Sequence, residues 1–158
     1  MAVRSLRRRS LAILAVAAAS ALVATGCSSD EGGSGGGGDG AVAVTLQEFA
    51  VIPSPASTAA GEVTFTATNE GPDDVHEFVI FQTDLAPDAL PTGEDGSVDE
   101  AGEGLTLIDE IEDIAVGDAP TLTVNLEAGS YVLICNIFDA TENEAHYELG
   151  MRIDFTVN

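Results

Sequence analysis

Residues 62–68 read Glu62-Val63-Thr64-Phe65-Thr66-Ala67-Thr68. Apolar side chains occupy every second position of this stretch, and threonines stand between them. Because successive side chains of a β-strand point to opposite faces, the alternation predicts a strand with one buried and one exposed face. Threonine, valine and phenylalanine are also residues that strands favour.

The same short-strand pattern recurs along residues 41–158, where no long segment has a convincing 3.6-residue period. Runs rich in Val, Ile, Thr and Phe lie at 42–49, 76–81, 121–126, 131–137 and 151–157. The residues between the runs are turn formers: Pro53 and Pro55, Ala60-Gly61, Asn69-Glu70-Gly71-Pro72 and Ala128-Gly129. Strands at this spacing predict one all-β domain, a Greek-key β-sandwich.

Two segments fit this pattern less clearly. Residues 83–104 are rich in Asp, Glu, Gly, Ala and Pro, and we predict a long acidic loop that is too polar for the core. In residues 105–116, Leu107, Ile111 and Ile114 would share one face of a helix. The same segment could equally serve as a strand or a loop, and both interpretations stay open.

The N-terminus has the features of an export signal. Four of the five basic residues of the chain lie within the first nine positions, and an apolar run of about fourteen residues, 11–24, follows. The run is too short to span a membrane and leads into polar residues, which predicts a signal peptide over residues 1–26. Residues 23–30 resemble a bacterial lipobox, which implies that Cys27 is the lipidated N-terminus of a lipoprotein.

Residues 27–40 predict a flexible tether. After Cys27 this segment contains only Ser, Asp, Glu and Gly, with seven glycines, and such a composition cannot bury a core. The sequence therefore predicts a domain at 41–158 that is held by a lipid anchor on the extracytoplasmic face of the cell membrane.

The charges exclude one class of partner. All 27 acidic residues follow the predicted signal peptide, the chain has no lysine, and Arg152 is the only basic residue beyond it. Binding to nucleic acid requires clustered Lys and Arg, so no nucleic-acid partner is expected. The acidic residues could simply be solvated, or could steer the domain toward a basic redox partner, and both interpretations stay open.

Four residues make up the whole supply of imidazole and sulfur ligands in residues 41–158: His76, Cys135, His146 and Met151. Two imidazoles, one thiolate and a weak axial thioether form the donor set of a blue-copper electron-transfer site. In the predicted strands His76, Cys135 and Met151 each share parity with residues expected to be buried, so they would point inward. His146 lies on the connection before the last strand, in a His-x4-Met pattern with Met151.

Four segments resemble the cupredoxin family of plastocyanin/azurin-like blue-copper proteins. They read Asn69-Glu70-Gly71, His76-Glu77-Phe78-Val79-Ile80, Gly129-Ser130-Tyr131-Val132-Leu133-Ile134-Cys135-Asn136-Ile137 and His146-Tyr147-Glu148-Leu149-Gly150-Met151. The resemblance covers nearly all of residues 41–158. It implies a Greek-key sandwich that binds one type 1 copper ion near one end.

The resemblance also implies the role of each site residue. His76, Cys135 and His146 would be the strong copper ligands and Met151 the axial ligand. The residues that support them would be Asn69, Glu77 and Asn136.

The chain departs from the family between Cys135 and His146. Ten residues separate them, whereas family members usually return to the second histidine after only a few. Loop-closure entropy grows only logarithmically with length, so an insertion of this size can be accommodated. Loop length also affects solvent exposure, and we expect a solvent-near edge of His146 to be the exit for electrons.

These features lead to a hypothesis about function: a membrane-anchored type 1 copper protein that carries one electron at a time. No catalytic constellation is evident, because both histidines belong to the predicted copper site, so we expect no enzyme activity. The expected partner is a redox protein similar to a cytochrome or an oxidase, a basic one in the steering interpretation, and the protein would be a monomer. Two alternatives stay open: an extracytoplasmic copper-binding or delivery module without a redox circuit, and a structural sandwich whose metal set has decayed.

Overall fold

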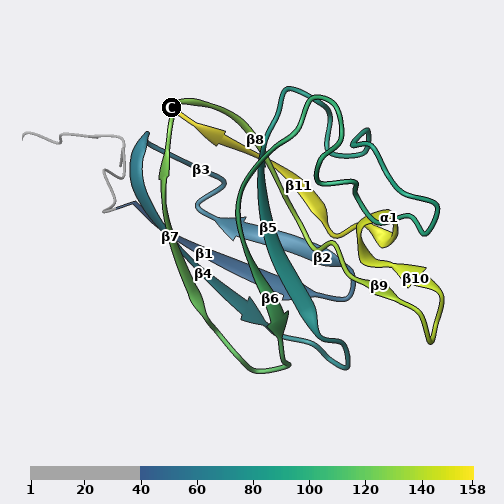
Figure 1. The fold of residues 1–158 in the computed structure, drawn as a ribbon. Coiled ribbons are helices and arrows are strands. Elements are labelled where there is room, and N and C mark those ends of the chain that lie inside the picture. The colour runs from purple at the N-terminus through teal and green to yellow at the C-terminus, as the bar shows by residue number, and fades with distance from the viewer. Residues whose placement is uncertain (1–39) are drawn as a thin grey trace, which may run out of the picture. The chain divides into compact units, whose positions relative to one another are not determined.

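The structure, a computed structural model, describes residues 40–158, which form eleven strands and one short helix (Figure 1). The predicted signal peptide, lipidation at Cys27 and nearly all of the predicted tether lie outside the described residues. The first half of the fold consists of β1 (Ala41–Gln47), β2 (Ala50–Ser54), β3 (Ser57–Thr58), β4 (Gly61–Asn69), β5 (His76–Gln82) and β6 (Thr106–Ile114). The second half consists of β7 (Thr121–Leu126), β8 (Gly129–Ile134), β9 (Phe138–Asp139), β10 (Glu144–Ala145), α1 (His146–Leu149) and β11 (Arg152–Val157).

The strands form two main sheets, as expected for a β-sandwich. One sheet has the order β2-β1-β4-β7, and the other has the order β3-β11-β8-β5-β6. The chain passes between these two sheets five times: on entering and on leaving β3, between β4 and β5, between β6 and β7, and between β7 and β8. The predicted all-β sandwich is therefore confirmed.

The core lies between these two sheets, and the apolar residues at every second position of β4 point into it. Val63, Phe65 and Ala67 are fully buried, as predicted. The Phe65 ring lies 5.4 Å from the ring of Phe78 on β5 and 5.7 Å from that of Phe155 on β11. Fully burying an aromatic or aliphatic side chain contributes about 1.5–3 kcal/mol, so this face of β4 stabilises the contact between the sheets.

Segment 83–104 covers the outer face of the five-stranded sheet, and the prediction that it is too polar for the core is wrong in part. Its Leu90 and Val98 are each only 5% exposed and belong to a second apolar cluster with Val79, Phe81, Val132, Ile134 and Tyr147. The Tyr147 hydroxyl donates to the carbonyl of Pro87 (2.7 Å) and accepts the N–H of Leu90 (3.1 Å). Two apolar residues and one tyrosine thus help to hold a mostly polar segment against the sheet.

The open segment 105–116 is mainly a strand. Its residues 106–114 form β6, which pairs antiparallel with β5 at the edge of the sheet. The sequence did not predict β2, which contains Pro53. Proline is tolerated there because β2 is the edge strand of its sheet, and an edge strand does not need every N–H group.

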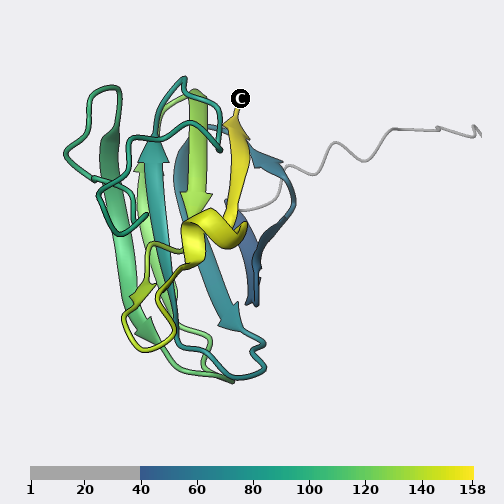
Figure 2. The ribbon, with the colours of Figure 1, turned by 90° about the vertical axis from the view of Figure 1, so that its right-hand side faces the viewer.

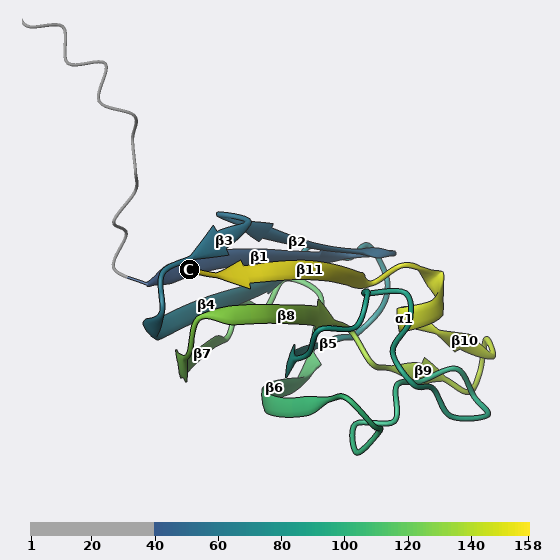
Figure 3. The same ribbon diagram turned by 90° about the horizontal axis from the view of Figure 1, so that it is seen from above.

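The short elements of the C-terminal part gather at one end of the sandwich. Figures 1 and 3 place α1, β9, β10 and the long loop between β5 and β6 at this end, which Figure 2 shows face on. Among residues 40–158 no helix is long and apolar enough to cross a membrane. This end of the sandwich is where the predicted ligands meet.

Candidate metal centre

Each predicted copper ligand lies at the end of a structural element or just beyond it. His76 begins β5, Cys135 directly follows β8, His146 begins α1, and Met151 lies between α1 and β11. Cys135, His76 and Met151 are fully buried, and His146 is 2% exposed. The ends of these elements therefore bring His76 to the same end of the core as the three ligands that lie 59 to 75 positions later in the sequence.

Three of these side chains converge. The Cys135 Sγ lies 3.5 Å from the Nδ1 of His146 and 3.8 Å from the Nδ1 of His76. The two Nδ1 atoms are 3.3 Å apart. Each residue of this Cys-His-His group offers one ligand atom, and these three atoms lie within 4.8 Å of one another.

Backbone hydrogen bonds fix the segments that carry these side chains. The N–H of Cys135 donates to the carbonyl of Met151 (3.0 Å), and the N–H of Met151 donates to that of His146 (3.0 Å). Gly150 ends α1 with a φ of 124°, a conformation that side-chain-bearing residues rarely adopt. The chain can therefore turn from α1 into β11 in two residues and place Met151 beside Cys135 in the backbone ladder.

The ten-residue connection between Cys135 and His146 folds as a small hairpin, β9–β10. The N–H of His146 donates to the carbonyl of Ile137 (2.9 Å), which closes the connection close to its start. The Phe49 ring packs edge-on against the His146 ring, with centroids 5.2 Å apart. Neighbouring side chains thus cover the His146 ring almost completely, and the solvent-near edge that serves as the exit for electrons stays a prediction.

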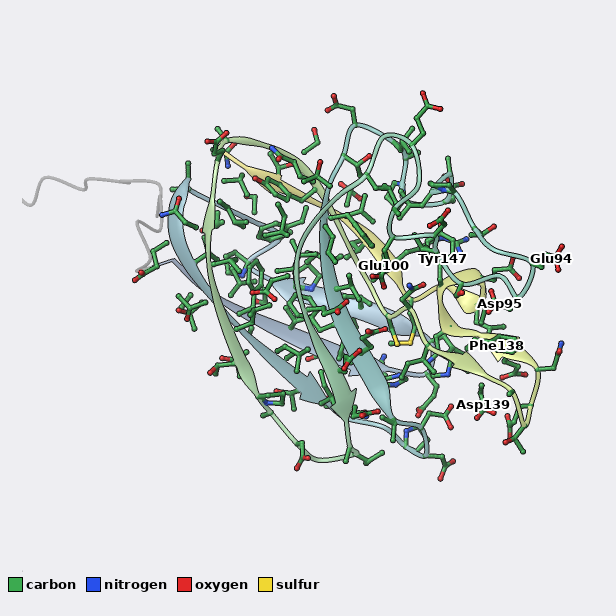
Figure 4. The ribbon with its side chains drawn as sticks, viewed as in Figure 1. Glu94, Asp95, Glu100, Phe138, Asp139 and Tyr147 are labelled. Carbon is green, nitrogen blue, oxygen red and sulfur yellow. The ribbon has the colours of Figure 1, made fainter. Side chains whose placement is uncertain are left out.

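His146 nevertheless lines an open pocket of about 550 Å³. The other residues around it are Asp73, Asp74, Val75, Asp113, Ile137, Phe138, Asp139 and Ala140. Figure 4 shows Phe138 and Asp139 at the same end of the sandwich as Glu94, Asp95 and Glu100. The pocket and its surroundings are therefore strongly acidic.

Solved structures share this architecture. An auracyanin from the photosynthetic bacterium Roseiflexus castenholzii, crystallised in a dithionite-reduced form, superposes with a TM-score of 0.52 at 22% identity, over 77% of this chain and 99% of its own. Auracyanin A from Chloroflexus aurantiacus, described as a "blue" copper protein, gives 0.52 at 20% identity, over 75% and 98%. The fold is that of the cupredoxins. No protein-family model matches the sequence, and no curated protein matches it significantly.

The cupredoxin resemblance also implied three supporting residues, and each of them makes different contacts. Asn69 is fully buried, and its side-chain amide donates to the carbonyls of Asp74 and Ile114 (both 2.8 Å) and accepts the N–H of Gly71 (2.8 Å). It thereby fixes the segment that leads into His76. It supports the site through the backbone of that segment.

Glu77 contacts the thiol through its backbone, because its N–H donates to the Cys135 Sγ (3.2 Å). Its side chain points elsewhere, to the carboxylates of Glu100 and Glu110, whose oxygens lie within 4.8 Å of its own. Burial raises the pKa of Glu77 to about 7, and the charges of Glu110, Glu100 and Glu112 contribute in the same direction.

Asn136 connects the site to segment 83–104. Its side-chain oxygen accepts the N–H of Val98 (2.6 Å), and its amide donates to the Val98 carbonyl and to the Glu100 carboxylate (both 3.1 Å). The residue after Cys135 thus anchors the segment that covers the outer face of the sheet.

Glu48 is a site residue that the sequence did not predict. It lies in the turn between β1 and β2, and its Oε1 accepts the N–H groups of Asp73 (3.1 Å) and Asp74 (2.7 Å). The same oxygen is 3.7 Å from the Nε2 of His76. Twenty-eight positions separate Glu48 from His76 in the sequence, and no local pattern marks the contact.

Burial controls the protonation of the three converging ligands. It raises the pKa of the Cys135 thiol to about 12, despite the backbone N–H groups of Ile137 and Glu77, which favour the thiolate. It lowers the pKa of His76, as does the neighbouring His146, and it also lowers the pKa of His146. Near neutral pH the metal-free site therefore holds two neutral imidazoles and a protonated thiol, which must lose its proton when a metal binds.

The geometry and chemistry of these residues fit a copper ion. For zinc, metal–ligand bonds to His and Cys are about 2.0–2.3 Å long, so two such donors on one ion can be at most about 4.6 Å apart. The three observed separations, 3.3, 3.5 and 3.8 Å, all satisfy this limit. Imidazole suits both oxidation states of copper, while the thiolate suits Cu(I), so this Cys-His-His group can hold one copper ion.

Proposed function

We propose that this chain is a membrane-anchored type 1 copper protein that carries single electrons. The observation that supports this function best is the convergence of the Cys135 Sγ with two Nδ1 atoms inside the core, with Met151 fully buried next to them in the backbone ladder. Bound there, copper would supply a one-electron Cu(I)/Cu(II) couple. Burial of all four residues favours an electron carrier over a copper-delivery module, since delivery requires ligands that a recipient protein can reach.

The protein's contribution is to hold the donors still. Strand β8 pairs with β5 on one side and with β11 on the other. These three strands set the positions of His76, Cys135 and Met151. The N–H of Glu77 donates to the Cys135 sulfur (3.2 Å) and so helps to hold it in place. Donors that cannot rearrange reduce the structural change that accompanies each electron transfer.

The test is the addition of Cu(II) to the purified protein. We expect intense visible absorption from a thiolate-to-copper transition, reversible on reduction, and no such band in Cys135→Ser. Cys27→Ser is the matched control and should retain the full band. A colourless wild-type protein that binds no copper would contradict the proposal, and loosely held, exchangeable copper would favour the delivery module.

We also propose that the redox partner is basic and docks at the acidic pocket beside His146. The pocket places carboxylates of Asp73, Asp74, Asp113 and Asp139 around the one ligand that lies next to solvent-filled space. Residues 40–158 contain a single Lys or Arg, Arg152, and it lies 4.9 Å over the Tyr147 ring, outside this pocket. A cationic patch on a partner would therefore be attracted by these carboxylates and repelled by no Lys or Arg of residues 40–158 at this surface.

Ionic strength tests the docking proposal. Electron transfer with a small cationic oxidant should slow as salt is added, whereas the rate with an anionic oxidant should rise. Asp73→Asn combined with Asp113→Asn should weaken both dependences, because both side chains are exposed at the pocket. Glu62→Gln, on an exposed position at the other end of β4, is the matched control and should leave the dependences unchanged.

The location of the protein is a further part of the proposal. We expect a lipid on Cys27 to hold the domain, as a monomer, on the extracytoplasmic face of the cell membrane. Mass spectrometry of the mature N-terminus should detect the lipid, and Cys27→Ser should move the protein from the membrane fraction to the soluble fraction. An unmodified Cys27 in the membrane fraction would contradict this mode of anchoring.

A further inference from the structure

The His76 ring has different neighbours on its two nitrogens. Its Nδ1 faces the other ligands, at 3.3 Å from the Nδ1 of His146 and 3.8 Å from the Cys135 Sγ. Its Nε2 faces the Glu48 carboxylate, 3.7 Å away. The imidazole thus stands between the metal donors on one side and an acidic side chain on the other.

Two buried polar atoms on the far side of the ring lack hydrogen-bond partners. His76 Nε2 and Glu48 Oε2 have no hydrogen-bond partner among the described residues. Two backbone N–H groups hold Oε1 in place, and the Glu48 side chain is 12% exposed. Buried polar atoms without a partner are costly, and an approach of about 0.8 Å would bring Glu48 Oε1 and His76 Nε2 within hydrogen-bond distance.

We propose that Glu48 is a positioning residue for His76, which accepts a hydrogen bond from Nε2–H and so leaves the Nδ1 lone pair directed at the metal. This inference rests on the proposed copper function. Imidazoles that bind metals commonly donate their second N–H to a carboxylate, which fixes the tautomer and the ring orientation. The negative charge behind the ring also favours Cu(II) over Cu(I), since the oxidised ion carries the greater positive charge.

Glu48→Gln tests this role in the copper-loaded protein. Glutamine has nearly the same shape and keeps an oxygen that can accept the N–H groups of Asp73 and Asp74, but it removes the charge. We expect Cu(II) affinity to fall at least about tenfold and Cu(I) affinity to fall less. Each tenfold difference between the two corresponds to a rise of about 59 mV in the one-electron potential. Glu70→Gln, on an exposed side chain of the same segment and outside the pocket beside His146, is the matched control and should leave the potential close to that of wild type.

The metal-free protein supplies an independent measurement. Nitrogen-15 NMR of the imidazole should show His76 with its proton on Nε2 in the wild type, and a smaller fraction of this tautomer in Glu48→Gln. A thermal melt of the variant checks that the fold is retained. If the variant does not fold, the tautomer of the wild-type ring still decides the question.

The outcomes separate this inference from the proposed function. A blue wild-type protein whose potential and His76 tautomer are unchanged by Glu48→Gln would overturn the role of Glu48 and leave the copper function intact. A His76 ring protonated on Nδ1 in the metal-free wild type would also overturn it. A colourless wild-type protein would contradict the copper function, while the NMR measurement would still report whether Glu48 orients His76.

Discussion

The two histidines reach the same thiol from regions that are built differently. His76 begins β5, an interior strand paired with β6 on one side and β8 on the other, and residues 78–81 of this strand are all fully buried. His146 begins a four-residue helix at the end of the β9–β10 hairpin, whose Phe138 and Asp139 are only half-buried. One histidine is therefore part of the sandwich core, and the other is part of an addition to its end.

The surroundings of the two rings differ in the same way. A carboxylate and a locked backbone segment lie behind His76, whereas an acidic pocket lies next to His146. Under the proposed function, the first histidine would fix the geometry of the site and the second would connect the site to a partner. If so, changes near His76 should affect the whole fold, and changes near His146 should remain local.

The largest expected effect comes from Phe78→Ala on β5. Removing a fully buried phenylalanine costs about 3–5 kcal/mol of unfolding free energy, because it leaves a cavity between the sheets. Phe138→Ala on the hairpin should cost about 1 kcal/mol. Urea denaturation of the metal-free proteins measures both. Equal losses would show that the hairpin is as integral to the core as β5.

A smaller effect is expected from Asn69→Ala. The variant leaves the carbonyls of Asp74 and Ile114 and the N–H of Gly71 without their partner, which should cost about 1–3 kcal/mol. Because this segment leads into His76, the copper band should also weaken or shift. Asn125→Ala, on an exposed position of β7, should change stability by less than about 0.5 kcal/mol and leave the band unchanged.

The region around His76 was also the more predictable one from sequence. Strand geometry predicts locally which residues of 62–68 face the core, and it does the same for His76, Cys135 and Met151. Every residue predicted in this way to face the core is buried. The predicted β7 has the observed bounds. Periodicity encodes which face a residue occupies, so these features could be derived from the sequence alone.

The features that could not be predicted from the sequence depend on contacts between distant segments. Glu48 meets His76 only after β1 and β5 have taken their places, and Leu90 is buried only because Tyr147 and the outer face of the sheet receive it. The burial of His146 follows from Phe49, which lies on another strand connection. Whether Met151 acts as the axial ligand stays a prediction.

The carboxylates on β5 and β6 should make the metal-free protein less stable as the pH rises. The pKa of Glu77 is raised to about 7 in the folded state from an ordinary value of 4.5, so the folded protein binds this proton more tightly than the unfolded chain. The resulting stability is fully present below about pH 4.5 and is lost as the pH rises through 7. Because Glu77 is partly exposed, we expect its contribution to be about 1–2 kcal/mol.

Glu110→Gln isolates this effect, since Glu110 is the charged neighbour that contributes most to the shift of Glu77. The variant should be more stable than wild type at pH 7.5 and should differ less at pH 4.5, as measured by urea denaturation at both values. Glu62→Gln provides the control for loss of one exposed negative charge. A constant difference between Glu110→Gln and wild type across this range would rule out the coupling.

The smallest expected effect tests whether the two regions are separate. Asp139 Oδ1 accepts the N–H groups of Thr141 (2.6 Å) and Glu142 (3.1 Å) and thereby closes the tip of the hairpin. Asp139→Ala should speed amide hydrogen exchange in residues 138–145 and leave exchange in β5 unchanged, because local opening of the hairpin does not require β5 to open. Asp139→Asn keeps an acceptor oxygen and should restore most of the protection. If β5 exchanged faster to the same extent as the hairpin, both histidines would be held by one cooperative unit. The separate roles proposed for them, in fixing the geometry and in contacting a partner, would then have no structural basis.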